Sequence, residues 1–138
     1  MGIQTSEWEG RLIHWIRTLE KDLYLPLERI HWEGFFTMEQ LSLEEAKKQA
    51  YIPVEPGFAW GRTWEYGWFR TVLKIPRKAA GKRVVLDLRQ NGEATLFVND
   101  QVFGTYRAEW IDKPHHYLVD NYLTRCAGER DVYEIYME

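Results

Sequence analysis

"TWEYGWFRTVLKIP", residues 63–76, is the stretch that decides the fold. It is rich in β-branched and aromatic residues, which favour β-strands. From residue 68 onward its side chains alternate between two faces, because successive residues of a strand point to opposite sides. One face carries Phe69, Thr71, Leu73 and Ile75, and the other carries Trp68, Arg70, Val72 and Lys74. The stretch therefore predicts a long strand.

Three of the chain's seven tryptophans, Trp60, Trp64 and Trp68, occur here at intervals of four. That interval would place the three rings on one face of a helix. Gly61 and Gly67 are poor helix residues, and the run continues into a strand, so we expect no helix here. On a strand the even-numbered residues share a face, so Trp64 and Trp68 would lie together and make that face aromatic.

Short β-patterns follow this strand without helices between them. Four further stretches have a strand pattern: "KRVVLDLR" (82–89), "EATLFV" (93–98), "QVFGTY" (101–106) and "DVYEIYME" (131–138). The hairpin signal Asn91-Gly92 precedes the second stretch, and a tight turn at Asn99-Asp100 precedes the third. This spacing predicts a mainly β fold, an antiparallel β-sandwich rather than an α/β sheet. The six strands that we count after residue 62 are fewer than the eight of a complete jelly roll.

The first part of the chain predicts helices. Ser6 with Glu9 fits a capping box, and apolar residues follow at helical spacing until Pro26. We therefore expect an amphipathic helix over residues 7–24, then an irregular connector over 25–40. A second capping box, Ser42 with Glu45, begins a short helix. Residues 1–59 would form a helical lead-in packed on the sandwich of residues 60–138, within one structural domain.

Composition and charge argue against several classes of protein, among them nucleic-acid-binding, membrane and disulfide-linked proteins. The 138 residues suffice for one domain, and the net charge of −3 gives no basic footprint for nucleic acid or an anionic membrane. No apolar run approaches the roughly 20 residues of a membrane helix, and residues 1–10 lack the pattern of a secretory signal. Cys126 is alone, which excludes an intramolecular disulfide and a cysteine zinc cluster. We expect a cytoplasmic protein.

Two of these stretches carry a family resemblance. "WGRTWEYGWFRTVLKIP" (60–76) and "GKRVVLDLRQNGEATLFVND" (81–100) resemble the N-terminal domain of bacterial and cytosolic-type α-mannosidases of glycoside hydrolase family 38. The run "HHYLVDNYLTRCAGERDVYEIYME" (115–138) is similar to the passage that closes that family's first sandwich domain. The resemblance covers residues 50–138 well and the helix more loosely. Asp100 departs from it, because the family usually has glycine there.

The resemblance implies a galactose-binding-like jelly roll that precedes a much larger catalytic domain. That catalytic domain holds zinc through a His-x-Asp pair, another Asp and another His, and one Asp is the nucleophile of a retaining mechanism. None of the four histidines here, His14, His31, His115 and His116, begins a His-x-Asp. We therefore expect no catalytic residue of that family, no metal site and no cofactor in this chain.

The aromatic residues are the candidate binding site. Trp60, Trp64, Tyr66 and Trp68 could offer flat apolar faces to the C–H groups of a sugar ring. The alternative is that these large rings fill the core or the seam between helix and sandwich. His115 and His116 would point to opposite faces of an extended segment, so they cannot readily chelate one metal. No spacing singles out a catalytic pair among the carboxylates Asp87, Glu93, Asp112 and Asp120.

Three functions are open at this point. The first is a non-catalytic N-terminal segment of an α-mannosidase-like glycoside hydrolase, which docks and shapes a catalytic domain. The second is an autonomous carbohydrate-binding module that uses the exposed tryptophans. The third is a structural, self-associating domain. We expect a homo-oligomer, formed by edge pairing of residues 131–138 or by packing of the helix across a two-fold axis.

Overall fold

The computed structural model describes residues 3–88, 92–107 and 122–138, and its main sheet is built around strand β3 (Tyr66–Lys74). Six strands form this sheet in the order β2-β1-β3-β8-β5-β6, and every neighbouring pair is antiparallel. The other five strands are β1 (Trp32–Thr37), β2 (Ile52–Val54), β5 (Glu93–Val98), β6 (Gln101–Arg107) and β8 (Val132–Met137). The predicted mainly β, antiparallel fold with an N-terminal helix is confirmed.

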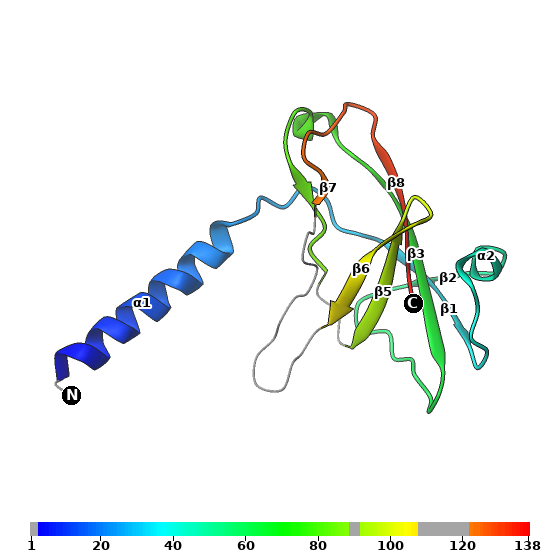
Figure 1. Cartoon of the computed structure of the whole chain (residues 1–138), viewed down its shortest axis with the longest axis horizontal. Helices are drawn as coiled ribbons and strands as arrows, with labels where there is room; N and C mark the ends of the chain where they lie inside the picture. Colours follow the sequence, from blue (N-terminus) through cyan, green and yellow to red (C-terminus); the bar gives the residue numbers. More distant parts are fainter. Residues whose placement is uncertain (1–2, 89–91, 108–121) are drawn as a thin grey trace.

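A second, smaller sheet consists of β4 (Val84–Val85) and β7 (Tyr122–Thr124). The short 3₁₀ helix η1 (Arg77–Ala79) precedes it. Backbone hydrogen bonds tie the two halves of this region together, from Ala127 N–H to the Lys82 carbonyl and from Gly81 N–H to the Ala127 carbonyl. Figure 1 shows this small sheet beside one end of the large one.

The large sheet has two apolar faces, because its strands alternate. On the inner face, Leu96, Ile135 and Met137 pack with Leu86 and Leu88 from the β4 segment. On the outer face, Trp68 and Tyr136 pack under Ala46 of helix α2 (Leu43–Ala46). The predicted capping box of α2 is confirmed, with Ser42 N–H donating to the Glu45 carboxylate at 2.8 Å.

The turn between β5 and β6 follows its sequence signal. Asn99 and Asp100 have φ values of 48° and 66°, the left-handed pair that a two-residue hairpin turn requires. The Asn99 side-chain oxygen also accepts a hydrogen bond from Glu134 N–H of β8 at 2.9 Å, which ties the hairpin to its neighbour. The other predicted turn residue, Asn91, lies outside the described residues.

Two expectations about strands were wrong. Residues 32–37 are not part of an irregular connector but form β1, which pairs with both β2 and β3. The sequence pattern did not indicate this strand, because Gly34 has no side chain and so interrupts the alternation of apolar and polar residues. Residues 131–138 do not form a sheet edge, because β8 pairs with β3 on one side and with β5 on the other. Over residues 135–137, where β8 is paired on both sides, a second chain would have to displace β3 or β5 in order to pair with β8.

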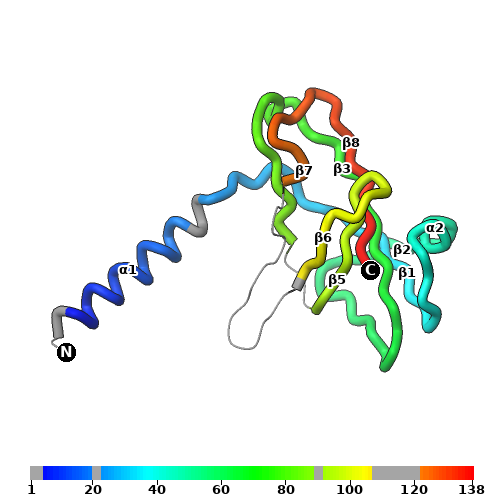
Figure 2. Tube along the Cα trace, in the orientation of Figure 1, coloured from blue at the N-terminus to red at the C-terminus, as the bar shows by residue number. Residues whose placement is uncertain are grey.

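The first helix, α1 (Ile3–Asp22), projects away from both sheets (Figures 1 and 2). It begins before Ser6, so the predicted start at residue 7 was wrong. Its described side chains are exposed, including Trp8 at 62% and Trp15 at 71%. We expected residues 1–59 to pack on the sandwich as a helical lead-in. In the structure the packed part of that segment lies within residues 27–58, which include β1, α2 and β2.

Candidate functional site

Trp68, a member of the predicted sugar platform, belongs to the core. Its side chain is fully buried on the outer face of the large sheet. The ring stacks on Phe97 with 6.1 Å between centroids and lies under Ala46 of α2. Its Nε1–H has no hydrogen-bond partner within the described part of the chain. Trp68 therefore offers no ring face to a ligand.

Trp64 lies in the turn before β3 and not on the strand. It is 85% exposed, and its φ of 65° is a left-handed conformation that is rare for a residue other than glycine. The carboxylate of Glu65 holds the turn by accepting hydrogen bonds from Gly61 N–H at 3.1 Å and from Arg62 N–H at 3.0 Å. The expectation that Trp64 and Trp68 share one face of a strand was wrong.

Trp60 packs flat against β3 over Gly67. A Cβ atom on Gly67 would come within 2.6 Å of two carbons of the Trp60 ring. The ring centroid lies 5.4 Å from that of Phe36 and 5.3 Å from that of Phe69, and Phe58 stacks on Phe36 at 5.6 Å. We call these four residues, Phe36, Phe58, Trp60 and Phe69, the aromatic cluster. Trp60 remains 46% exposed, so one part of its ring is open.

The four predicted platform residues are therefore not one surface. Tyr66, the first residue of β3, is half-buried and pairs with Thr37 of β1. Trp68 is in the core, Trp64 protrudes at a turn, and Trp60 belongs to the aromatic cluster. Of these four residues, Trp60 belongs to the lining of a cavity.

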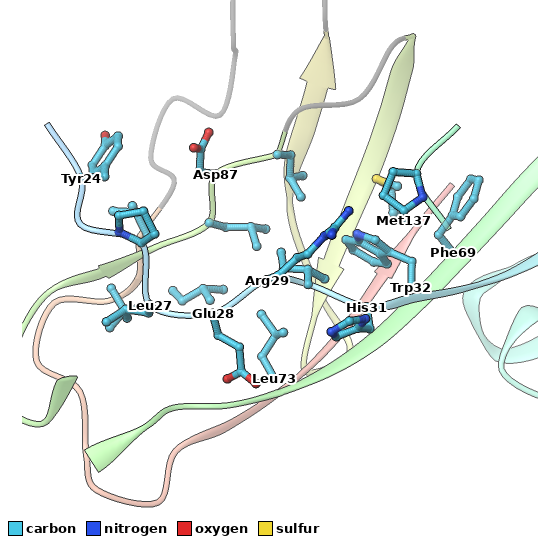
Figure 3. A pocket seen from close by; sticks show the side chains of 18 of the residues that line it. Tyr24, Leu27, Glu28, Arg29, His31, Trp32, Phe69, Leu73, Asp87 and Met137 are labelled. Carbon is cyan, nitrogen blue, oxygen red and sulfur yellow. The ribbon is translucent and has the colours of Figure 1, made fainter. Parts of the chain in front are cut away.

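That cavity is a hollow of about 1440 Å³ over the inner face of the large sheet, which we call the sheet hollow. Trp60, Phe69, Leu73 and Met137 belong to its lining. The longest further stretches of its lining are segments 23–32, 54–58 and 82–88. Figure 3 shows the segment that carries Tyr24, Leu27, Arg29 and Trp32 crossing the hollow, between Leu73 of β3 and Asp87.

The crossing segment is anchored at intervals and exposed between its anchors. Ile30 and Trp32 pack against the inner-face core, and Leu27 packs against the cluster around Ile75 and Ala79. Between these anchors Glu28, Arg29 and His31 are exposed. Leu25, which precedes the first anchor, is 85% exposed. The sequence analysis missed this segment, because "LPLERIHW" (25–32) has neither a helical nor a strand period. Only Pro26, which ends the helix, indicates that it is extended.

Both signs of charge surround the apolar floor of the hollow. The lining includes the carboxylates of Glu28, Asp87, Glu93 and Glu138 and the cations of Arg29, Lys82 and Arg83. Burial raises the pKa of the Glu138 carboxyl above its ordinary value. An apolar floor with a mixed polar rim is typical of a protein-docking surface.

The comparison with protein families agrees with this architecture. A family model described as "Alpha-mannosidase, jelly roll domain" matches residues 25–138, which contain all the strands of both sheets and the crossing segment from Leu25 onward. The chain belongs to this family. The resemblance to the N-terminal domain of family 38 α-mannosidases is confirmed.

Two curated relatives share part of this jelly roll domain. The human protein named Alpha-mannosidase 2C1 is 31% identical over 98 residues, which cover 71% of this chain and 9% of the human protein. Its mouse counterpart is 36% identical over 64 residues, which cover 46% of this chain and 6% of the mouse protein. The matched segments thus span less than a tenth of the length of these relatives. No solved structure matches it.

The resemblance implies a zinc centre in the family's catalytic domain, and the described residues of this chain bear on that expectation. Among residues 3–88, 92–107 and 122–138, no group of three or more His, Cys, Asp or Glu side chains could hold a metal ion. His115, His116, Asp112 and Asp120 lie outside the described residues. In the same described ranges no helix is long and apolar enough to cross a membrane.

The outer face of the jelly roll domain carries a polar network that holds α2 to the sheet. Lys47, directly after α2, forms ion pairs with Asp100 and with Glu134, the latter at 3.2 Å. Arg70 forms an ion pair with Glu33 at 2.6 Å, and its guanidinium lies over the Tyr51 ring at 4.4 Å. These groups satisfy one another across neighbouring strands, so we assign them a structural role.

Tyr51 is the titratable group in this network whose surroundings perturb it most strongly. Its hydroxyl donates to the Ala46 carbonyl at 3.1 Å. Burial, together with the neighbouring Tyr136, raises the pKa of Tyr51 to about 12, although Arg70 opposes the shift. The neutral phenol is thus part of the packing between α2 and the sheet.

Proposed function

We propose that this chain acts as the non-catalytic jelly roll segment of an α-mannosidase-type glycoside hydrolase, docking a catalytic domain and shaping its substrate site. Membership of the family supports the enzyme class, and the short span of the match supports a role as one part of a larger assembly. The observation that carries the docking role is the sheet hollow, with its apolar floor and charged rim. We keep a cytoplasmic location as part of the proposal, and the single free cysteine Cys126 agrees with it.

The hollow has the features of a docking surface. Stable interfaces combine an apolar centre with a polar rim, and a few large side chains supply most of the binding free energy. Phe58 and Trp60 border the hollow and are 44% and 46% exposed, while Leu25 stands out at its other wall. A partner that covered these side chains would remove their apolar surface from water.

The test mixes this chain with the separately produced catalytic region of an α-mannosidase encoded in the same genome. Size-exclusion chromatography with light scattering should show a complex at low micromolar concentration. The rim variants Leu25→Asp and Phe58→Lys should weaken it at least tenfold. Val102→Lys, an exposed position on β6 that does not line the hollow, is the matched control and should bind as the unmodified chain does.

Two further measurements complete this test. Hydrolysis of a chromogenic mannoside should change when the chain is added and should return to its basal rate with Leu25→Asp. Circular dichroism of each variant verifies that the sheet is intact. The absence of a complex at about 10 μM would mean a dissociation constant larger than that of most specific interfaces. This result would contradict the docking role.

A carbohydrate-binding function is the second candidate, and one observation favours it. Tyr24 and Trp60 are both half-exposed and line the sheet hollow, together with polar groups such as Arg29 and Asp87. Aromatic faces beside polar tips are suited to sugar rings. Titration with mannose and mannobiose should then shift the tryptophan fluorescence, and Trp60→Phe should reduce the shift. No response at millimolar sugar removes this candidate.

A further inference from the structure

Helix α1 carries an apolar stripe that nothing in the described part of the chain covers. Its members are between 54% and 71% exposed: Trp8, Leu12, Trp15, Ile16, Leu19 and Leu23, the last directly beyond the helix. Away from the stripe most side chains of the helix are polar, although Ile13 is 51% exposed, and Arg11 and Glu7 form an ion pair at 2.9 Å. One side of α1 is therefore suited to water, and the other to a partner surface.

The spacing of the stripe identifies the kind of partner. Trp8, Leu12, Trp15 and Leu19 are separated by four, three and four residues. This is the repeat of the seam of a coiled coil, in which each side chain inserts between residues of a facing helix. The surface that fits such a seam is another helix with the same repeat.

We propose that α1 pairs with α1 of a second copy of this chain, antiparallel and across a two-fold axis. In that register Trp8 faces Leu19 of the other copy, and Leu12 faces Trp15. Each of the four layers then contains one tryptophan and one leucine, so all layers have the same volume. Uniform layers pack without voids or overlaps.

The parallel arrangement is poorer because it puts equal residues opposite each other. Two layers would contain Trp–Trp pairs and two would contain Leu–Leu pairs. The helices would have to separate at the tryptophans and would then leave gaps at the leucines, and both overpacking and cavities are unfavourable. The distribution of sizes along the stripe thus selects the antiparallel direction.

The area of the stripe agrees with a dimer. At roughly 100 Å² for each of its six side chains, the two helices would together bury about 1,200 Å², the lower end of stable interfaces. A contact of α1 with its own sheet hollow is less suitable. Residues 23–32 lead directly from α1 into the hollow and already line it, while the helix points away (Figure 1).

Light scattering on the 138-residue chain tests the proposal first. The unmodified chain should have about 33 kDa at high micromolar concentration, twice its 16.6 kDa. Leu12→Lys and Trp15→Lys place a charge in the seam and should each give a monomer. His14→Lys, an exposed position on the opposite side of α1, is the matched control and should remain a dimer. Unchanged circular dichroism and thermal unfolding of the sheet verify that the monomers are folded.

Disulfide cross-linking in a Cys126→Ser background tests the direction. An equimolar mixture of Leu12→Cys and Trp15→Cys chains should form mixed 12–15 disulfides. Leu19→Cys alone should not cross-link, because its two copies would lie about 11 residues, or roughly 16 Å, apart along the helices, beyond disulfide reach. A monomeric unmodified chain overturns the pairing. Efficient cross-linking of Leu19→Cys to itself overturns the antiparallel register.

Discussion

Replacing Gly67 by alanine should destabilise the domain, and only because Trp60 lies over it. The new Cβ would lie 2.6 Å from two carbons of the Trp60 ring, far inside ordinary contact distance. Strand β3 itself cannot move without disturbing its ladders with β1 and β8. The Trp60 ring lies in the loop before β3 and is half-exposed, so this ring is the group that must move.

The magnitude follows from the contacts that the ring would lose. Trp60 has two aromatic partners, Phe36 at 5.4 Å and Phe69 at 5.3 Å. At about 0.5–1.5 kcal/mol for each aromatic pair, the loss is about 1–3 kcal/mol. Alanine in place of glycine within a strand gains about 0.5–1 kcal/mol through the unfolded chain. The net range is about 0–2.5 kcal/mol, and from the middle of both ranges we expect Gly67→Ala to lower the free energy of unfolding by about 1 kcal/mol.

A double-mutant cycle with Trp60→Ala isolates this cause. Urea unfolding, followed by circular dichroism at one protein concentration, gives the free energy of unfolding of the four chains. In the Trp60→Ala background the clash is absent, so Gly67→Ala should be neutral or slightly stabilising. An equal loss of stability in both backgrounds would refute the reasoning, because the cost would then come from the strand and not from the ring.

Three further predictions concern single side chains. Trp64→Gly should raise the free energy of unfolding, measured in urea, by up to about 1 kcal/mol, because glycine adopts the left-handed φ without strain and the lost ring is exposed. A clear loss of stability in this variant would contradict the prediction. The pKa of Tyr51 is about 12 in the folded chain and about 10 in the unfolded chain, because the folded state disfavours the phenolate. The unmodified chain should therefore lose stability as the pH rises from 10 to 12. Tyr51→Phe should reduce that loss in urea unfolding at pH 9.5 and 11.5, and equal losses would exclude Tyr51 as its source. Hydrogen bonds from the Ser42 side chain and backbone lower the pKa of the Glu45 carboxyl. Ser42→Ala should therefore be destabilising above pH 5, where the carboxylate is ionised. The difference in stability between this variant and the unmodified chain should shrink as the pH falls through the lowered pKa. A pH-independent difference in thermal unfolding would show that the carboxylate has no part in this cap.

Local features of the fold were predictable from the sequence. The alternation of residues 68–75 correctly predicts β3, and Asn99-Asp100 predicts the hairpin turn, because both depend on neighbouring residues alone. Strand β1 was missed, since Gly34 contributes no side chain to its alternation. The family was recognised from an ordered set of motifs, which carry more information than periodicity does.

The candidate site was less predictable, because exposure depends on contacts between distant segments. Trp60, Trp64 and Trp68 have the same residue type and spacing, yet they are respectively clustered, protruding and buried. What separates them is Gly67, which admits the Trp60 ring, and α2, which covers Trp68. Neither neighbour can be deduced from the interval of four.

The place of β8 has a consequence for synthesis on the ribosome. Strands β1, β2 and β3 make one half of the large sheet, and β5 and β6 make the other, with β8 as the strand that joins them. Until residues 132–137 leave the exit tunnel, β3 and β5 each present an open edge of backbone amides and carbonyls. The large sheet therefore cannot be completed until β8, which both ladders share, has been synthesised, and the nascent chain is exposed to mispairing at these two edges until then.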